Sequence, residues 1–207
     1  MTLIDTTETL DFGPAVGLFC RECGNKVPLG ARHVCEECFG PLEVSYNFGN
    51  ITRAQIEAGP KSIWRYAALL PVPQDAANRP VDLAPGFTKL LPSVNLAKRL
   101  GMKKLWIKDD RDNPTHSFKD RVVAVAMTAG KTLGFTTISC ASTGNLANAV
   151  AAAAARAGIR SVVLIPDNLE KGKVVTSAVY GTTLVGIHGN YDDVNRLCSE
   201  IADDRGY

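Results

Sequence analysis

The sequence lacks a long apolar run, a large charge imbalance and any basic run interleaved with aromatic residues. Its longest mostly apolar stretch, Ala147–Ala155, is interrupted by Asn148 and is far too short to span a bilayer. The acidic segment Met1–Ala15 does not have the charged-then-apolar pattern of a signal peptide. A formal net charge of +2 argues against nucleic acid or a membrane as a partner. We therefore expect a cytoplasmic protein.

Composition divides the 207 residues into four zones. Residues 1–16 are expected to be a flexible lead-in, and residues 17–46 a small module that holds four of the six cysteines. Residues 47–80 form a helical, proline-rich connector. Residues 81–207 alternate helix and strand patterns. With 45% apolar and 21% charged residues, the chain can build a hydrophobic core of ordinary size.

Four of the cysteines form two C-x₂-C pairs separated by 11 residues, namely Cys20, Cys23, Cys35 and Cys38. Each pair can place two thiolates on one metal ion from a tight turn, for which Gly24 and Gly40 are suited. This spacing predicts a structural zinc ribbon, flanked by strands at 16–19 and 42–46. Iron in a rubredoxin-like site and reduced, metal-free cysteines are the alternatives.

The other two cysteines, Cys140 and Cys198, stand alone within an apolar strand and an amphipathic helix. We expect both to be buried small hydrophobic side chains rather than nucleophiles.

The last zone predicts a parallel α/β sheet flanked by helices. Strands are expected at 104–108, 136–140, 161–165 and 182–187, and helices at 117–133, 145–157, 171–180 and 192–202. The run at 161–165 is apolar throughout, as suits a strand buried on both faces. The alternation predicts a further strand after Tyr207, and a doubly wound sheet that ends on a helix is the alternative.

A lysine segment, Asn113-Pro114-Thr115-His116-Ser117-Phe118-Lys119-Asp120-Arg121, precedes one of these helices. Pro114 holds Asn113 extended, and Ser117 is a plausible N-cap. Lys119 then lies in the first helical turn, where the helix dipole disfavours an ammonium group. Burial there would lower the pKa of Lys119 further, as a Schiff-base lysine requires. A solvated surface lysine is the alternative.

A second segment, Ser142-Thr143-Gly144-Asn145, lies between a predicted strand and an alanine-rich helix. Small residues at a helix N-terminus leave backbone N–H groups free for an anion. A plain strand-to-helix turn capped by Asn145 or Thr143 is the alternative.

Together the two segments resemble the paired motifs of the fold-type II pyridoxal-phosphate enzymes, and most closely those of the threonine synthase family. That family reads N-P-T-G-S-F-K-D-R, followed some 20 residues later by S-x-G-N. The segment Gly86–Leu90 is similar to the G-x-T-P-L segment of that family, and Lys108-Asp109 is similar to its K-D/E pair. The segment Gly40–Val44 follows the cysteines here, as the same G-P-L-E-V segment does in many threonine synthases. His116 replaces the usual glycine and Lys89 the usual proline. His116 is expected to be a tolerated turn residue, with a substrate contact as the alternative.

The resemblance implies a role for each matched residue. Lys119 would bind pyridoxal 5′-phosphate as a Schiff base and move protons on the substrate, with Asn145 and Phe118 also at the cofactor. Ser142, Thr143, Gly144 and Thr88 would bind the substrate. Lys108 and Arg121 are expected to be solvated or salt-bridged, with a phosphate-facing role as the alternative. The glycine-rich phosphate loop of the family is absent from the 207 residues.

The reaction implied is the conversion of O-phospho-L-homoserine and water to L-threonine and phosphate by the complete enzyme, for which a homodimer is the expected assembly. The 207 residues alone are expected to be inactive. A cysteate synthase, a threonine dehydratase or a cysteine synthase is the alternative within the fold. A non-catalytic interaction fragment, in which a zinc ribbon is joined to half an enzyme, is the alternative of a different class.

Overall fold

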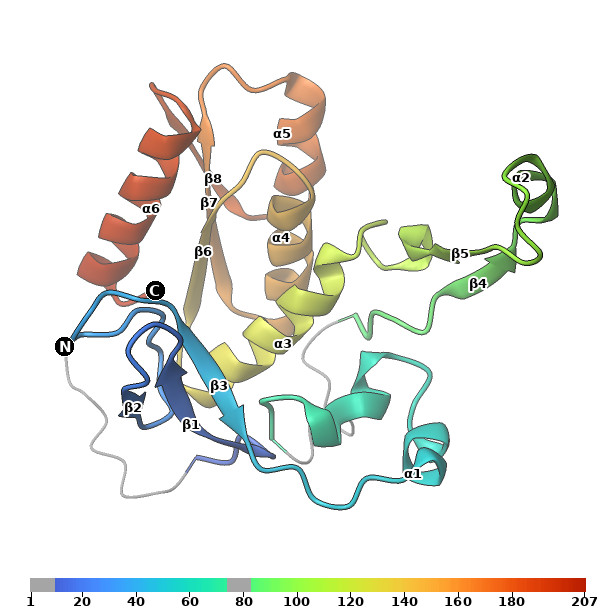
Figure 1. Ribbon diagram of the computed structural model, residues 1–207. Coiled ribbons are helices and arrows are strands. Elements are labelled where there is room, and N and C mark those ends of the chain that lie inside the picture. Colours follow the sequence, from blue (N-terminus) through green and yellow to red (C-terminus); the bar gives the residue numbers. More distant parts are fainter. Residues whose placement is uncertain (1–9, 74–82) are drawn as a thin grey trace.

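The computed structural model describes residues 10–73 and 83–207, which form three separate sheets and their helices (Figure 1). The first nine residues of the expected lead-in, the end of the connector, and residues 81–82 at the start of the last zone lie outside the described residues. Among the described helices, none combines the length and the apolar character that a membrane crossing requires.

The cysteine-rich module contains a three-stranded antiparallel sheet in the order β2-β1-β3. Its strands are β1 (Ala15–Cys20), β2 (Lys26–Val27) and β3 (Leu42–Tyr46). Leu18 in the middle of β1 pairs with both neighbouring strands, opposite Val27 and Val44, and is buried. The sheet therefore brings the segments that carry the two cysteine pairs together at one end of β1.

The connector folds into two short helices, α1 (Arg53–Ala58) and η1 (Ile63–Leu69). Thr52 and Gln55 form a capping box that fixes the start of α1. Trp64 of η1 is 2% exposed and packs with Val72 and Ala124, so this apolar cluster fastens the connector to the helix that follows the lysine segment.

The strand expected at 104–108 is shifted and pairs differently from our prediction. It forms β5 (Trp106–Asp109), which pairs antiparallel with β4 (Lys89–Pro92), and α2 (Val94–Arg99) connects the two strands. The expectation that this strand belongs to the parallel sheet is wrong. The apolar run predicts a strand correctly, but its partner lies across a helical connection that the sequence pattern does not reveal.

The parallel sheet has the order β6-β7-β8, with β6 (Thr137–Ala141), β7 (Arg160–Pro166) and β8 (Thr183–Ile187). Helices α4 (Asn145–Ala157) and α5 (Lys171–Ala178) cover one face, and α6 (Tyr191–Arg205) covers the other (Figure 1). In the central strand, Val163 packs toward α4 and α5 and Leu164 toward α6, and both are fully buried. This is the α/β fold that the sequence predicts.

Helix α3 (Lys119–Thr132) packs against α4 through Val123 and Met127 on one side and Ala149, Val150 and Ala153 on the other. The alanines let the two helix backbones approach closely, and the apolar contact fixes the positions of both helices. Both candidate segments therefore enter one packed unit, because the lysine segment leads into α3 and Ser142–Asn145 into α4.

Candidate functional site

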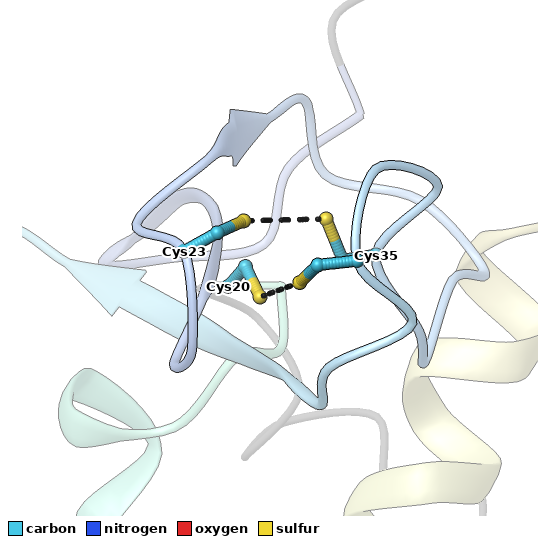
Figure 2. A group of neighbouring side chains, drawn as sticks. Cys20, Cys23 and Cys35 are labelled. Carbon is cyan, nitrogen blue, oxygen red and sulfur yellow. Dashed lines mark hydrogen bonds between the residues drawn. The ribbon is translucent and has the colours of Figure 1, made fainter.

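The sulfur atoms of Cys20, Cys23, Cys35 and Cys38 all lie within 4.8 Å of one another. The Sγ–Sγ distance is 3.4 Å between Cys20 and Cys38 and 3.7 Å between Cys23 and Cys35. Figure 2 shows the side chains of Cys20, Cys23 and Cys35 pointing toward one another. A tetrahedral zinc ion with Zn–S bonds of about 2.3 Å needs sulfur separations of roughly 3.8 Å. The cluster is therefore compatible with zinc.

The two cysteine turns repeat the same backbone hydrogen bonds. The N–H of Cys20 donates to Asn25 O at 2.7 Å, and the N–H of Cys35 donates to Gly40 O at 2.9 Å. The N–H of Gly24 donates to Cys20 O, and the N–H of Phe39 donates to Cys35 O. Both turns need a left-handed residue directly after the second cysteine. Gly24 (φ 73°) provides it in the first turn, but in the second it is Phe39 (φ 58°) and not Gly40.

Gly40 is required for a different reason. A Cβ atom there would lie 2.7 Å from Glu22 Cγ and 3.0 Å from Cys20 Sγ. The absent side chain thus lets the second turn approach the first, which closes the sulfur cluster.

Backbone N–H groups also favour thiolates at two of the sulfurs. Hydrogen bonds from two backbone N–H groups, that of Cys38 with the larger effect and that of Glu37 with the smaller, lower the pKa of Cys35 to about 6. The N–H of Cys23 lowers the pKa of Cys20 in the same way. Thiolates are the form in which cysteine binds metal, and such N–H donors orient them around the ion.

Hydrogen bonds within the lysine segment hold its loop in place. Thr115 donates from its backbone N–H and from its hydroxyl to the Asp120 carboxylate, at 2.8 and 2.7 Å. The Ser117 hydroxyl accepts the N–H of Lys119 at 3.2 Å, but the N-cap residue of α3 is Phe118 and not Ser117 as we predicted. Because Asp120 is buried and occupied by Thr115, it does not pair with the neighbouring Lys119.

The Lys119 side chain is half-buried, and its Nζ lies 5.1 Å from the centre of the Phe118 ring, which is 57% exposed. In the described parts of the chain, the Lys119 amine makes no ion pair and no hydrogen bond. An amine with an aromatic neighbour and no carboxylate partner is available for covalent attachment to an aldehyde such as that of pyridoxal phosphate.

Hydrogen bonds connect the segment Gly86–Thr88 to the lysine segment. The N–H of Gly86 donates to Asn113 Oδ1 at 2.9 Å, and Asn113 is 2% exposed. Thr88 and Arg121 both donate to Asp110 Oδ1, at 2.8 and 2.7 Å. The hydrogen bond from Arg121 has the largest effect on the pKa of Asp110 and lowers it. Burial raises this pKa, and the hydrogen bond from Thr88 lowers it further, so that the pKa of Asp110 lies below its ordinary value.

The contacts of Gly86–Thr88 bear on the roles expected for Thr88 and Arg121. Thr88 is buried and hydrogen-bonded to Asp110 and Arg121, and its contact with the substrate stays a prediction. Arg121 is salt-bridged, as we expected. Asp110 was missed because no motif marks it, although an acidic residue close to a motif arginine is a usable signal.

His116 has a left-handed backbone (φ 60°), and its Nδ1 lies 2.8 Å from Arg111 O. The glycine usual at this position in the resembling family is explained by this angle, since only glycine adopts it without strain. Lys89, the second departure, forms an exposed ion pair with Asp112 at 3.2 Å.

The Ser142–Asn145 turn follows β6 directly and opens α4. The Ser142 hydroxyl accepts the N–H of Ala147 at 3.2 Å and that of Gly144 at 3.4 Å. The N-cap residue of α4 is Gly144, and not Thr143 or Asn145 as we considered. In the described residues, the N–H groups of Thr143, Asn145 and Leu146 carry no hydrogen bond. Three free donors at the start of a 13-residue helix suit a carboxylate.

The sequence analysis did not predict a structural role for Tyr191. Its hydroxyl donates to Ala141 O at 3.3 Å, which ties the first residue of α6 to the end of β6 just before Ser142. Among the described residues, no hydrogen bond joins Lys119 to Ser142, Thr143 or Asn145, and the packing of α3 on α4 is what relates them.

Of the two lone cysteines, Cys198 is buried as predicted, whereas Cys140 is only partly buried. Cys198 is 8% exposed and packs with Ala141, Leu164 and Val194. Burial raises the pKa of Cys140 to about 12, so its thiol is not activated.

The amino-acid sequence of this chain is similar to sequences of known proteins. The relatives found include threonine synthases from Methanosarcina acetivorans, 39% identical over 191 residues, and Methanocaldococcus jannaschii, 34% identical over 191 residues. The matches cover 88% and 90% of this chain but 46% and 47% of those proteins. The chain thus spans about half the length of these relatives.

Solved structures share the fold over more than half of this chain. A pyridoxal 5′-phosphate-dependent aspartate racemase is 26% identical with a TM-score of 0.53, covering 58% of this chain and 38% of its own. Threonine deaminase isoform 2 from Solanum lycopersicum is 23% identical with a TM-score of 0.54, covering 57% and 33%. The second likeness concerns the fold alone.

Residues 81–207 match the family described as pyridoxal-phosphate dependent enzymes, and this range contains both the Lys119 and the Ser142–Asn145 segments. The resemblance to threonine synthase that the motifs indicate is confirmed by the curated relatives. The chain belongs to the pyridoxal-phosphate dependent enzyme family and corresponds to the N-terminal part of a threonine synthase-like protein.

Proposed function

We propose that the complete enzyme converts O-phospho-L-homoserine and water to L-threonine and phosphate, and that Lys119 binds the cofactor. The observation that carries the proposal is the free, half-buried Lys119 amine in the first turn of α3, where the neighbouring Thr115, Ser117 and Asp120 side chains are already hydrogen-bonded. Eight matched relatives, 34–42% identical, are all named threonine synthase.

Each candidate residue has a defined task in this reaction. Lys119 would hold the cofactor until the substrate amine displaces it, and would then take the proton from the substrate α-carbon. The N–H groups of Thr143, Asn145 and Leu146 would bind the substrate carboxylate, and the Asn145 side chain would donate to the cofactor's 3′-oxygen. The cofactor, when bound, supplies an electron sink for the charge left at the α-carbon.

Phe118 and the substrate-side roles of Ser142, Gly144 and Thr88 remain part of the proposal. Ser142 and Gly144 support it by shaping the turn that exposes the neighbouring N–H groups. For Thr88 the hydrogen bonds with Asp110 and Arg121 favour an indirect role, in which Thr88 positions the loop and does not touch the substrate.

Chemical labelling tests the lysine assignment. The complete enzyme would be reduced with borohydride in the presence of pyridoxal phosphate and digested, and the labelled peptide identified. We expect the pyridoxyl group on Lys119. Label on Lys108 or Lys131 instead would refute the assignment. Lys108 already donates to Thr88 O and Lys131 to Ala157 O.

We also propose that Cys20, Cys23, Cys35 and Cys38 bind one structural zinc ion. Four thiolates complete a tetrahedron and leave no open position for substrate. Elemental analysis of purified protein should give about one zinc per chain. Folded, metal-free protein in which all six thiols react would contradict this proposal.

Two other classes of function, another enzyme of the same fold and a non-catalytic fragment, are the alternatives to the proposed reaction. Cysteate synthase, threonine dehydratase and cysteine synthase would use the same Lys119, so only the products formed from each amino-acid substrate distinguish them. For a non-catalytic fragment we expect no specific labelling of Lys119 in the complete protein.

A further inference from the structure

The two cysteine turns match each other position for position. In each turn the N–H of the first cysteine, Cys20 or Cys35, donates to the carbonyl of the residue five positions later, which is Asn25 or Gly40. Cys20 and Cys35 are both buried. Figure 2 shows the turn that carries Cys20 facing the turn that carries Cys35 across the sulfur atoms. Asn25 and Gly40 therefore occupy equivalent places, although only Asn25 has a side chain that can donate a hydrogen bond.

Each of these equivalent residues lies against the sulfur of a buried cysteine in the opposite turn. In the second turn, a Cβ atom at Gly40 would lie 3.0 Å from Cys20 Sγ, so the backbone itself packs on that sulfur. In the first turn, Asn25 Nδ2 lies 3.8 Å from Cys35 Sγ, within reach of an N–H···S hydrogen bond. The two turns thus differ chemically, because the sulfur of Cys20 meets bare backbone and that of Cys35 meets an amide donor.

The backbone of Asn25 is held in place independently of its side chain. Lys26, the next residue, pairs with Phe19 across β1 and β2, and the carbonyl of Asn25 accepts the N–H of Cys20 at 2.7 Å. The side chain therefore reaches Cys35 from a fixed position. Within the described residues, Asn25 is the only residue other than a cysteine whose side chain hydrogen-bonds to a sulfur of the cluster.

A carboxamide is well suited to a thiolate in this position. The Asn25 side chain offers two N–H donors and carries no net charge. Four thiolates outweigh the charge of one zinc ion, so the cluster is net negative when the ion is bound, and an N–H donor stabilises the sulfur that it meets. The amide does so without taking a coordination position. Hydrogen-bond partners of this kind fix the orientation of a metal ligand.

We propose that Asn25 is a positioning residue of the metal site, whose side-chain amide donates to the Cys35 thiolate and holds the two cysteine turns together. The inference rests on the proposed zinc site and deepens it, because Asn25 lies outside the C-x₂-C pairs that indicate the metal. Loss of such an outer hydrogen bond typically weakens metal binding about 10- to 100-fold. A side chain that only filled the space between the turns would instead be replaceable by any residue of the same shape.

Two substitutions separate hydrogen-bond donation from shape. Asn25→Ala removes the amide, and Asn25→Asp keeps its shape but replaces the N–H donor with a carboxylate that repels the thiolates. Both fit the backbone, because Asn25 does not have a left-handed φ. Competition of the purified protein with a chromogenic chelator measures the zinc affinity. We expect the affinity to fall about 10- to 100-fold in Asn25→Ala, and further in Asn25→Asp.

Cobalt(II) in place of zinc gives a readout that a purely structural role would not move. The N–H donor lowers the energy of the sulfur lone pairs, so we expect the sulfur-to-cobalt charge-transfer absorption of both variants to move to longer wavelength. The d–d bands should keep the pattern of tetrahedral sulfur coordination. Asn47→Ala is the matched control, because Asn47 is exposed and follows β3, outside the sulfur cluster. It should change neither the zinc affinity nor the absorption.

Zinc affinity in Asn25→Asp equal to that of the unmodified protein would overturn the proposal, because the two side chains share a shape and differ in donation. So would an unshifted charge-transfer band in Asn25→Ala. Either result leaves the zinc site itself standing, whereas protein that binds no zinc would overturn the site and the role of Asn25 together. Amide protection in β7, which lies outside the cysteine module, checks that each variant is folded.

Discussion

His116 is a non-glycine residue held in the left-handed backbone region on the loop that presents Lys119. His116→Gly and His116→Ala both remove the imidazole contact with Arg111 O, and they differ only in the Cβ atom. We expect the glycine variant to be the more stable of the two by about 1 kcal/mol, since a Cβ is disfavoured at this angle. Urea unfolding of both variants measures the difference, and an alanine variant of equal or greater stability would contradict it.

Asp110 joins the two motif segments through Thr88 and Arg121, and its pKa lies below the ordinary value of 3.8. A depressed folded-state pKa stabilises the protein above about pH 4. This contribution is lost as the pH falls through the folded-state value. We therefore expect Asp110→Asn to lower the free energy of unfolding by roughly 1.5 kcal/mol at pH 7, as for a hydrogen bond to a charged group. In acid, the difference from the unmodified protein should shrink.

Urea unfolding at pH 7 and near pH 3 checks the Asp110 prediction. Asp204→Asn is the matched control, because Asp204 forms only an exposed pair with Arg205. A deficit of Asp110→Asn that is the same at both pH values would show that its charge is not what stabilises the loop.

At the scale of elements, we expect the fold of the cysteine module to depend on a bound metal ion. Its sheet has two short edge strands, β2 and β3, and few buried side chains besides Leu18, Cys20 and Cys35. If zinc binds there, its binding free energy stabilises the fold of the module. We expect a strong chelator to abolish amide protection in β1–β3 and to leave β6–β8 protected.

The control for the loss of metal is a substitution of Cys140, a cysteine that lies outside the sulfur cluster. Cys38→Ser should lower the zinc content, whereas Cys140→Ala should keep one zinc per chain, because Cys140 lies among apolar side chains of the parallel sheet. Hydrogen exchange and elemental analysis measure both effects. A module that stays protected after complete chelation would mean that zinc is not needed for its fold.

Elements whose signals are local were predicted well from the sequence. Helix α4 was expected at 145–157 and has those bounds, because its alanine run and Gly158 terminator act within the segment itself. The antiparallel pairing of β4 with β5 was not predicted, since it depends on the connection through α2. The structural roles of Asn113 and Asp110 were missed for the same reason, because Gly86 and Thr88, their partners, lie more than 20 residues earlier.

At the scale of the whole molecule, the two candidate segments supply only part of a cofactor site. The dianionic phosphate of the cofactor needs its own set of N–H donors, and the sequence contains no glycine-rich run of the family's kind. The free N–H groups at Thr143, Asn145 and Leu146 are already assigned to the substrate carboxylate. Lacking several charge-assisted hydrogen bonds, each worth about 1.5–3 kcal/mol, should weaken binding by orders of magnitude.

We therefore expect the 207-residue chain alone to bind pyridoxal phosphate weakly and to release no phosphate from O-phosphohomoserine. The test is a cofactor titration followed by absorbance, together with a phosphate-release assay. Lys119→Ala is the control, and in the short chain it should change the weak absorbance signal little, because other exposed lysines react nonspecifically. In a chimera in which the C-terminal part of the Methanosarcina acetivorans relative follows Tyr207, the same substitution should abolish both saturable binding and turnover. Saturable micromolar binding with turnover by the 207 residues alone would show that they already contain a complete phosphate site.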